Sequence, residues 1–212
     1  MASVAPTINA TSSEDYARRI NNVKPFAKRI HIDVGDGVFT DVKTVGLTQV
    51  YDIDLVPFDL HLMMVHPESQ LENIISLQPH LVIVHFEAPF DRADFFRELR
   101  SMEINVGLAI NVETTIEQVR DILPDIQHLL VFTGQIGHNG GEFRFDCLEK
   151  IGQARLINPD LEIGVDGGLN QETGRMAIEA GADLLDVGSF IHDADDPEIA
   201  YVAMEAIAEG VS

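Results

Sequence analysis

The stretch Ile30-His31-Ile32-Asp33-Val34 alternates aliphatic and ionisable residues, which is the pattern of a β-strand whose two faces meet different surroundings. Seven further short apolar runs occur along the chain, and segments with helical spacing separate most of them. Strands that alternate with helices favour an α/β protein with parallel pairing. The predicted strands are Val4–Asn9, Arg29–Val34, Phe58–Met63, Leu81–Phe86, Asn105–Ile110, His128–Phe132, Glu162–Val165 and Leu184–Val187.

Eight such units predict a (β/α)8 TIM barrel that forms a single compact domain over residues 1–212. No Gly/Ser-rich linker or charge block divides the chain into parts. A doubly wound open sheet is the alternative. However, no Gly-x-Gly-x-x-Gly follows the first predicted strand, so a dinucleotide-binding fold is disfavoured.

Several helices have recognisable starts. Asn170 and Asp196-Pro197 are typical of the first residues of a helix, and two capping boxes predict two more starts. These boxes are Thr11-Ser12-Ser13-Glu14 and Thr114-Thr115-Ile116-Glu117. Residues 34–58 have little helical spacing, so this connection is predicted to be mostly loop.

The composition excludes some classes of partner. The chain has 35 Asp and Glu against 14 Lys and Arg, a net charge of -21, which argues against nucleic acid and anionic membranes because both require a basic surface. A single cysteine, Cys147, cannot form an internal disulfide, the first residues lack the basic start and apolar run of a signal peptide, and no apolar run approaches the length that spans a bilayer. We therefore expect a soluble, cytoplasmic protein. A homo-oligomer is expected because barrels often associate.

Ionisable residues fall on the face of three strands that points into the predicted barrel. His31 and Asp33 share one such face, Asp59, His61 and Met63 share another, and Asp166 follows the last outward aliphatic residue of its strand. Active sites of barrels lie at the carboxyl ends of the strands, where these residues fall. Two imidazoles and two carboxylates can bind one divalent metal ion such as Zn, Fe, Mn or Co, and a buried hydrogen-bonded network without metal is the alternative.

A second polar pair and three glycine-rich segments also lie at predicted strand ends. His85 and Glu87 follow a run of aliphatic residues and are interpreted as supporting or core polar groups. Glycines gather after three predicted strands, where free backbone N–H groups can hold a phosphate without Lys or Arg, and tight turns of the barrel are the alternative for any one of these loops. They lie in Gly134–Gly141, Gly167-Gly168 and Gly188-Ser189.

Four short motifs in this order resemble those of the ribulose-phosphate 3-epimerase family. They are His31-Ile32-Asp33-Val34-Gly35-Asp36-Gly37, Asp59-Leu60-His61-Leu62-Met63, His85-Phe86-Glu87-Ala88 and Val165-Asp166-Gly167-Gly168, and the end of the chain near Gly188-Ser189 resembles the family's closing phosphate loop. The resemblance covers nearly the whole chain. It implies a cytoplasmic isomerase of carbohydrate metabolism, in the pentose phosphate pathway, that inverts C3 of a ketose phosphate.

The resemblance also implies roles for individual residues. It implies His31, Asp33, His61 and Asp166 as ligands of one divalent metal ion, and Asp33 and Asp166 as the acid/base pair. Two carboxylates can exchange the C3 proton from opposite faces of the sugar through a 2,3-enediolate, whose charge a metal can stabilise. The residues expected to bind substrate or phosphate are Asn9, Met63, Gly140, Gly141, Gly167, Gly168, Gly188 and Ser189.

The sequence departs from the family pattern near the substrate. Ala10 replaces a serine, Gly35 and Phe132 replace methionines, and the loop 134–141 loses its proline. Ribulose 5-phosphate and xylulose 5-phosphate are the leading substrates. A six-carbon ketose phosphate such as allulose 6-phosphate is an alternative, because Ala10 and Gly35 are expected to leave space.

Two other functions are weighed. A non-catalytic barrel that binds a sugar phosphate is the alternative from outside the enzymes. A hexulose-phosphate synthase or orotidine-phosphate decarboxylase relative is disfavoured, because His61 stands where the Asp-x-Lys-x-x-Asp set of those families has lysine.

Overall fold

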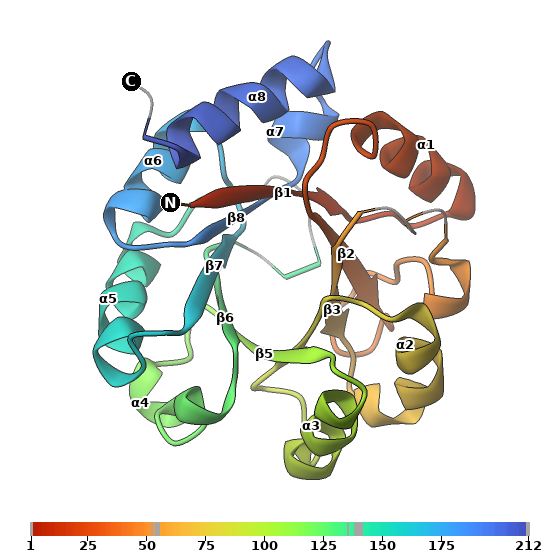
Figure 1. Cartoon of the computed structure of the whole chain (residues 1–212), viewed down its shortest axis with the longest axis vertical. Coiled ribbons are helices and arrows are strands. Elements are labelled where there is room, and N and C mark those ends of the chain that lie inside the picture. The colour runs from red at the N-terminus through yellow and green to blue at the C-terminus, as the bar shows by residue number, and fades with distance from the viewer. Residues whose placement is uncertain (1, 52, 54–55, 135, 138–141, 211–212) are drawn as a thin grey trace.

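The computed structural model describes residues 2–51, 53, 56–134, 136–137 and 142–210, and its eight strands close into one parallel barrel in sequence order (Figure 1). The strands are β1 (Ser3–Ile8), β2 (Ile30–Gly35), β3 (Phe58–Met63), β4 (Leu81–His85), β5 (Asn105–Ile110), β6 (His128–Phe132), β7 (Glu162–Asp166) and β8 (Leu184–Val187). The predicted (β/α)8 barrel is confirmed, and every predicted strand agrees with the structure to within one residue at each end.

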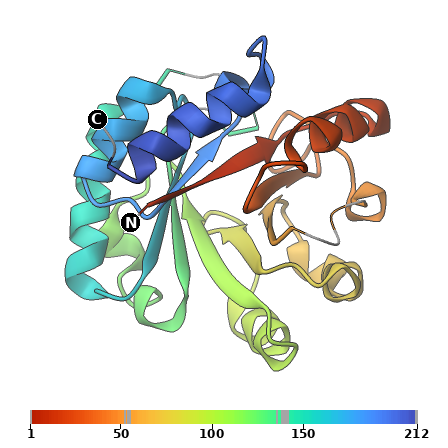
Figure 2. The same ribbon diagram turned by 45° about the horizontal axis from the view of Figure 1, so that its top comes forward.

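The helices surround the barrel on its outside (Figures 1 and 2). They are α1 (Ser13–Val23), α2 (Leu71–Leu77), α3 (Arg92–Ser101), α4 (Ile116–Val119), α5 (Leu148–Ile157), α6 (Gln171–Glu179), α7 (Ser189–His192) and α8 (Pro197–Ala208). Short 3-10 helices cover Leu47–Gln49, Pro67–Gln70, Leu123–Asp125 and Phe145–Cys147. Within the described residues, none of the helices has the length and apolar character needed to cross a membrane.

Two of the predicted helix starts are shifted by one residue. The N-cap of α1 is Ser12, whose hydroxyl accepts from the amide of Asp15, and the N-cap of α4 is Thr115, paired with Gln118 in a capping box. In both cases the sequence offers adjacent hydroxyl residues, and packing of the helix selects the second. Asn170 and Asp196 cap α6 and α8 as predicted. In the described part of residues 34–58, the one helical element is a 3-10 turn.

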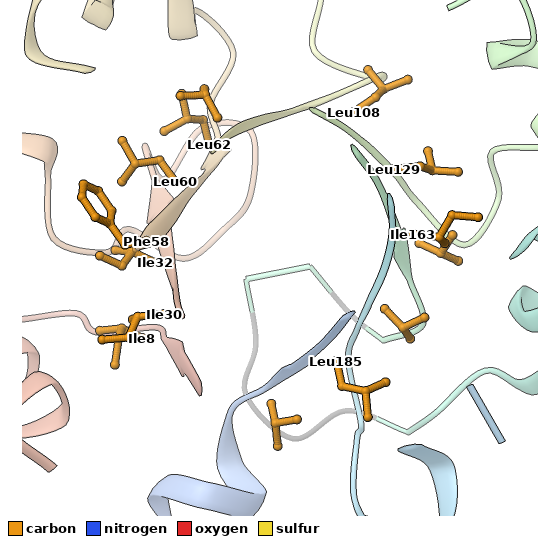
Figure 3. Close-up of a cluster of buried hydrophobic side chains, with 14 of the residues drawn as sticks. Ile8, Ile30, Ile32, Phe58, Leu60, Leu62, Leu108, Leu129, Ile163 and Leu185 are labelled. Carbon is orange, nitrogen blue, oxygen red and sulfur yellow. The ribbon is translucent and has the colours of Figure 1, made fainter. Parts of the chain in front are cut away.

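The alternation of side chains along the strands produces two buried regions, one between the barrel and its helices and one inside the barrel. The aliphatic side chains of β2 and β3, such as Ile32 and Leu60, lie on the outer side of the barrel and pack under the helices (Figure 3). Inside the barrel, a small apolar cluster fills the centre. It consists of Leu81, Ile83, Ala109 and Leu130. The inward positions of β2, β3, β7 and β8 include six ionisable residues, so the barrel carries these groups on its inner face: His31, Asp33, Asp59, His61, Asp166 and Asp186.

An ion-pair network occupies the end of the barrel where the strands begin. Arg29 Nε donates to Asp59 Oδ2 over 2.7 Å, and the other guanidinium nitrogens donate to both carboxylate oxygens of Glu162. His128 Nδ1 lies 2.8 Å from the same Glu162 carboxylate. Asp59 therefore points inward as predicted, but its partner is Arg29 and it belongs to this end of the barrel.

Candidate active site

Four of the predicted residues converge at the other end of the barrel. His31 and Asp33 come from β2, His61 from β3, and Asp166 is the last residue of β7. One potential ligand atom from each of these side chains lies within 4.8 Å of the others, and all four side chains are buried. The β2–β3 register sets Asp33 beside His61, whereas Asp166 reaches the group only because the barrel closes.

Asp33 is the centre of this cluster. Its Oδ1 lies 2.8 Å from His61 Nδ1 and 3.3 Å from His31 Nε2. The second nitrogen of His31, Nδ1, lies 3.3 Å from Asp186 Oδ1 on β8. Neither nitrogen of His31 is in hydrogen-bond geometry, although both are fully buried. A buried imidazole with unsatisfied nitrogens between two carboxylates is poised to bind a further group.

The cluster fits a divalent metal ion. Three carboxylates, those of Asp33, Asp166 and Asp186, line one cavity, and its described lining residues include no Lys or Arg. Such a concentration of negative charge away from water is costly unless a cation offsets it. Imidazole nitrogens combined with carboxylate oxygens suit Zn, Fe, Mn or Co.

The environment drives the pKa values of the two predicted acid/base residues apart. Burial by itself would raise the pKa of Asp33, but the imidazoles of His31 and His61 beside its carboxylate outweigh that effect and bring this pKa below its ordinary value. Burial raises the pKa of Asp166 well above its ordinary value, and the neighbouring charge of Asp33 adds to the effect. The pKa values of the two carboxyl groups are therefore shifted in opposite directions, which is the pattern expected of a base and an acid.

His61 connects this cluster to His85 and Glu87. His61 Nε2 lies 2.8 Å from His85 Nε2, and His85 Nδ1 lies 3.2 Å from Glu87 Oε2. Glu87 accepts in turn from the amide of Asn111 and from the hydroxyl of Thr114. Burial lowers the pKa of His61 to about 4, so its ring is neutral at pH 7. His85 thus contacts the nitrogen of His61 that does not face Asp33, and Glu87 holds His85 from behind, which agrees with a supporting role for both residues.

A cavity lies at the carboxyl ends of the strands, next to Asp33 and Asp166. Its lining residues are Thr7, Asn9, Asp33, Phe132, Gly137, Asp166, Gly167, Gly168, Leu169, Asp186, Gly188 and Ser189. Most of the residues expected to bind substrate are among them. Met63 is fully buried and does not line this cavity, and Gly140 and Gly141 lie outside the described residues.

Sequence analysis missed two polar residues of the cavity, Thr7 and Asp186, and the apolar Leu169. The Oγ1 atom of Thr7 is buried without a hydrogen-bond partner, and Thr7 shares the inner face of the first strand with Asn9. Asp186 stands two residues before Gly188 in an otherwise aliphatic run. The same alternation that turns His31 and Asp33 into the barrel also turns Thr7 on β1 and Asp186 on β8 inward, so the sequence does carry a signal for both residues.

The expected space at Ala10 and Gly35 is not present. A Cβ atom at Gly35 would lie 2.8 Å from the carbonyl oxygen of Val42, so the following loop already fills this position. Ala10 is buried among the aliphatic residues outside the barrel and does not line the cavity. Phe132 does line it, and its ring centre lies 6.1 Å from that of His61. These departures therefore do not enlarge the cavity for a six-carbon sugar.

Comparison with known proteins identifies similar sequences over the full length of the chain. The model of the ribulose-phosphate 3 epimerase family matches residues 3–192. The chain is 31% identical to the ribulose-phosphate 3-epimerase of Mycobacterium bovis, over 99% of this chain and 94% of that protein. It is also 31% identical to the ribulose-phosphate 3-epimerase of Bacillus subtilis, over 92% of this chain and 94% of that protein.

Solved structures share the fold at lower identity. A 3-hexulose-6-phosphate synthase from Salmonella typhimurium superposes with a TM-score of 0.76 at 17% identity, over 99% of this chain and 100% of that one. A 3-keto-L-gulonate-6-phosphate decarboxylase from Vibrio cholerae gives a TM-score of 0.77 at 12% identity, over 100% and 99% of the two chains. At such identities the likeness establishes the barrel fold and not the reaction.

Proposed function

Because the chain belongs to the ribulose-phosphate 3 epimerase family, we propose that it interconverts ribulose 5-phosphate and xylulose 5-phosphate by inverting C3. Its relatives identify it as an isomerase of the epimerase type that acts on carbohydrates. The observation that carries the proposal is the pair Asp33 and Asp166, which line one cavity from two strands that are not neighbours. Their pKa values are shifted in opposite directions, as a base and an acid require.

In this reaction the ionised carboxylate of Asp33 removes the proton from C3, and the electron pair of the C–H bond moves into the enediolate formed across C2 and C3. The protonated carboxyl group of Asp166 then delivers its proton to the opposite face of C3. Asp33 ends the half-cycle protonated and Asp166 ionised, so the two groups exchange roles when the reaction runs backwards.

The same side chains would hold the metal. His31, Asp33, His61 and Asp166 would bind one divalent ion such as Zn, Fe, Mn or Co, whose chemistry when bound is Lewis-acid stabilisation of the enediolate charge. His61 contributes as a neutral imidazole, which is the form that binds metal. The packing of Phe132 beside His61 keeps one wall of the site apolar, which strengthens the electrostatic interactions within it.

Backbone amides are proposed to hold the phosphate. Gly167, Gly168, Gly188 and Ser189 follow β7 and β8 and line the same cavity, and its described lining offers no basic side chain. Loops after the seventh and eighth strands of a barrel are the usual phosphate site. Anchoring the phosphate there orients C3 between the two carboxyl groups. Asn9 is proposed to contact the sugar, and Met63 is left out because it does not reach the cavity.

Proton NMR in D2O tests the reaction and the substrate together. Metal-replete protein is expected to exchange the C3 proton of ribulose 5-phosphate while the xylulose 5-phosphate signals grow. The five-carbon substrate is preferred because Gly35 and Ala10 leave no extra space. Exchange with allulose 6-phosphate alone would make the six-carbon sugar the substrate. Binding of both sugars without exchange would show that the barrel is a non-catalytic binding protein.

The phosphate proposal predicts the effect of Gly167→Ala. Gly167 has φ of +109°, and a Cβ atom there would lie 2.5 Å from the amide nitrogen of Gly134, so the loop must move. We expect KM for the sugar phosphate to rise ~10-fold, which corresponds to a loss of about 1.4 kcal/mol of binding, with a smaller change in kcat. Gly152→Ala is the matched control, because nothing lies within 4 Å of that Cβ position. Equal KM values for the two variants would contradict the role of the loop.

A further inference from the structure

Asp186 is a buried carboxylate to which the proposed reaction gives no task. It is 1% exposed, lies on β8, and lines the same cavity as Asp33 and Asp166. Among the described residues, neither of its carboxylate oxygens has a hydrogen-bond partner. Its one ion-pair contact among the described residues is with His31, at 3.3 Å from Oδ1 to Nδ1. The register pairs Asp186 with Asp166 on one side and with Ala5 on the other, so it faces the barrel interior.

Two other carboxylates of this barrel, the buried Asp59 and the partly exposed Glu162, have much stronger partners. Asp59 accepts from the guanidinium of Arg29 over 2.7 Å, and Glu162 is paired with both Arg29 and His128. The described lining of the cavity around Asp186 includes no Lys or Arg, and two other carboxylates share that cavity. Removing such a group from water is unfavourable, and packing alone would be satisfied better by an aliphatic side chain. Asp186 therefore has a task that requires its charge or its acceptor atoms.

The charge and acceptor atoms of Asp186 act on His31. Its ring stands between two carboxylates, with Nε2 3.3 Å from Asp33 and Nδ1 3.3 Å from Asp186. An imidazole that binds metal through one nitrogen almost always donates the N–H of the other to a carboxylate or carbonyl, which fixes the tautomer and the orientation of the ring. In the described structure, the acceptor available to Nδ1 of His31 is Asp186.

We propose that Asp186 is a positioning residue that accepts the Nδ1–H of His31 and so directs the Nε2 lone pair into the cluster formed with Asp33, His61 and Asp166. The proposal rests on the metal site of the proposed function and adds a residue to it. Asp186 acts through His31 and takes no part in moving the C3 proton.

Metal affinity of three variants tests this role without relying on turnover. Asp186→Val removes the acceptor, and is expected to weaken the binding of Zn or Co about 10- to 100-fold in competition with a chromophoric chelator. Asp186→Asn keeps the shape and an acceptor oxygen and is expected to recover part of that loss. Asp183→Asn is the control, since it removes a carboxylate just before the same strand and outside the cavity, and is expected to bind metal as the wild type does.

The tautomer of His31 gives a second readout that needs no variant. In Zn-loaded wild-type protein, long-range nitrogen–proton NMR is expected to show His31 protonated at Nδ1 and metal-bound at Nε2. Wild-type metal affinity in Asp186→Val, or a His31 protonated at Nε2, overturns the role of Asp186 while leaving the proposed function intact. Equal loss of affinity in Asp183→Asn also overturns it. A wild-type protein that binds no metal overturns this proposal and the metal site together.

Discussion

Replacing Asp33 or Asp166 by Asn is expected to lower the rate of epimerisation by ~10²- to 10⁴-fold, which is the usual contribution of a positioned acid or base. Each substitution keeps the shape of the side chain and removes its ability to carry the C3 proton. Because the two carboxyl groups serve opposite faces of the sugar, each variant is expected to retain C3 exchange in D2O with one epimer only. The epimer that still exchanges should differ between Asp33→Asn and Asp166→Asn.

Asp59→Asn is the matched control for this experiment. Asp59 is also a buried carboxylate on the inner face of the barrel, but it is bound to Arg29 at the end opposite the cavity. This substitution is expected to lower stability and to leave kcat of the folded protein near the wild-type value. Metal content must be measured alongside, since Asp33 and Asp166 also belong to the metal cluster. Wild-type turnover in either cavity variant, with metal bound, would refute the two-base assignment.

Removing the metal with a chelator is expected to abolish turnover and to lower thermal stability. A ligand present at 100 times its Kd stabilises the folded state by about 2.7 kcal/mol, which for a domain of this size is about 5–10 °C in Tm. Part of this stabilisation comes from relieving the repulsion among Asp33, Asp166 and Asp186, which line one cavity. Adding back Zn, Mn, Co or Fe(II) should restore both Tm and turnover, and the relative activities should rank the metals.

Two histidine variants separate specific binding from adventitious binding. His61→Ala removes a ligand from the cluster and is expected to show no rise in Tm on adding metal. His66→Ala removes a histidine that is exposed just beyond β3, and should respond to metal as the wild type does. Full turnover in a protein shown to be metal-free would mean that the reaction does not require a metal. An equal response of the two variants would mean that metal binds elsewhere.

The sequence was sufficient for the barrel and for half of the site because both depend on a local rule. Side chains alternate between the two faces of a strand whatever lies across the barrel. The inward residues can therefore be predicted directly from the stretches Ile30-His31-Ile32-Asp33 and Asp59-Leu60-His61. Helix caps are equally local, and Asn170 and Asp196 behaved as predicted. The errors at α1 and α4 amount to one residue, where two hydroxyl side chains compete for the same position.

Other features required the closed barrel. Asp59 and His61 share the inner face of β3, but two residues along a strand span about 6.6 Å. This distance places Asp59 near the amino-terminal end of the barrel, where it pairs with Arg29, while His61 belongs to the cluster at the carboxyl end. Gly35 suggested an open space in the sequence, but the carbonyl of Val42 occupies it. No motif pairs Asp186 with His31, because the two come from strands that are separated by β1 and meet only when the sheet closes.

The amino-acid sequence by itself determined which side chains face inward, because that depends on the backbone geometry of each strand. The tertiary structure alone decided which of those side chains meet, which space is filled, and in which direction the pKa of each carboxyl group is shifted. Those outcomes depend on the stagger of strands around the barrel and on charges that approach one another through its interior, where burial strengthens their interaction.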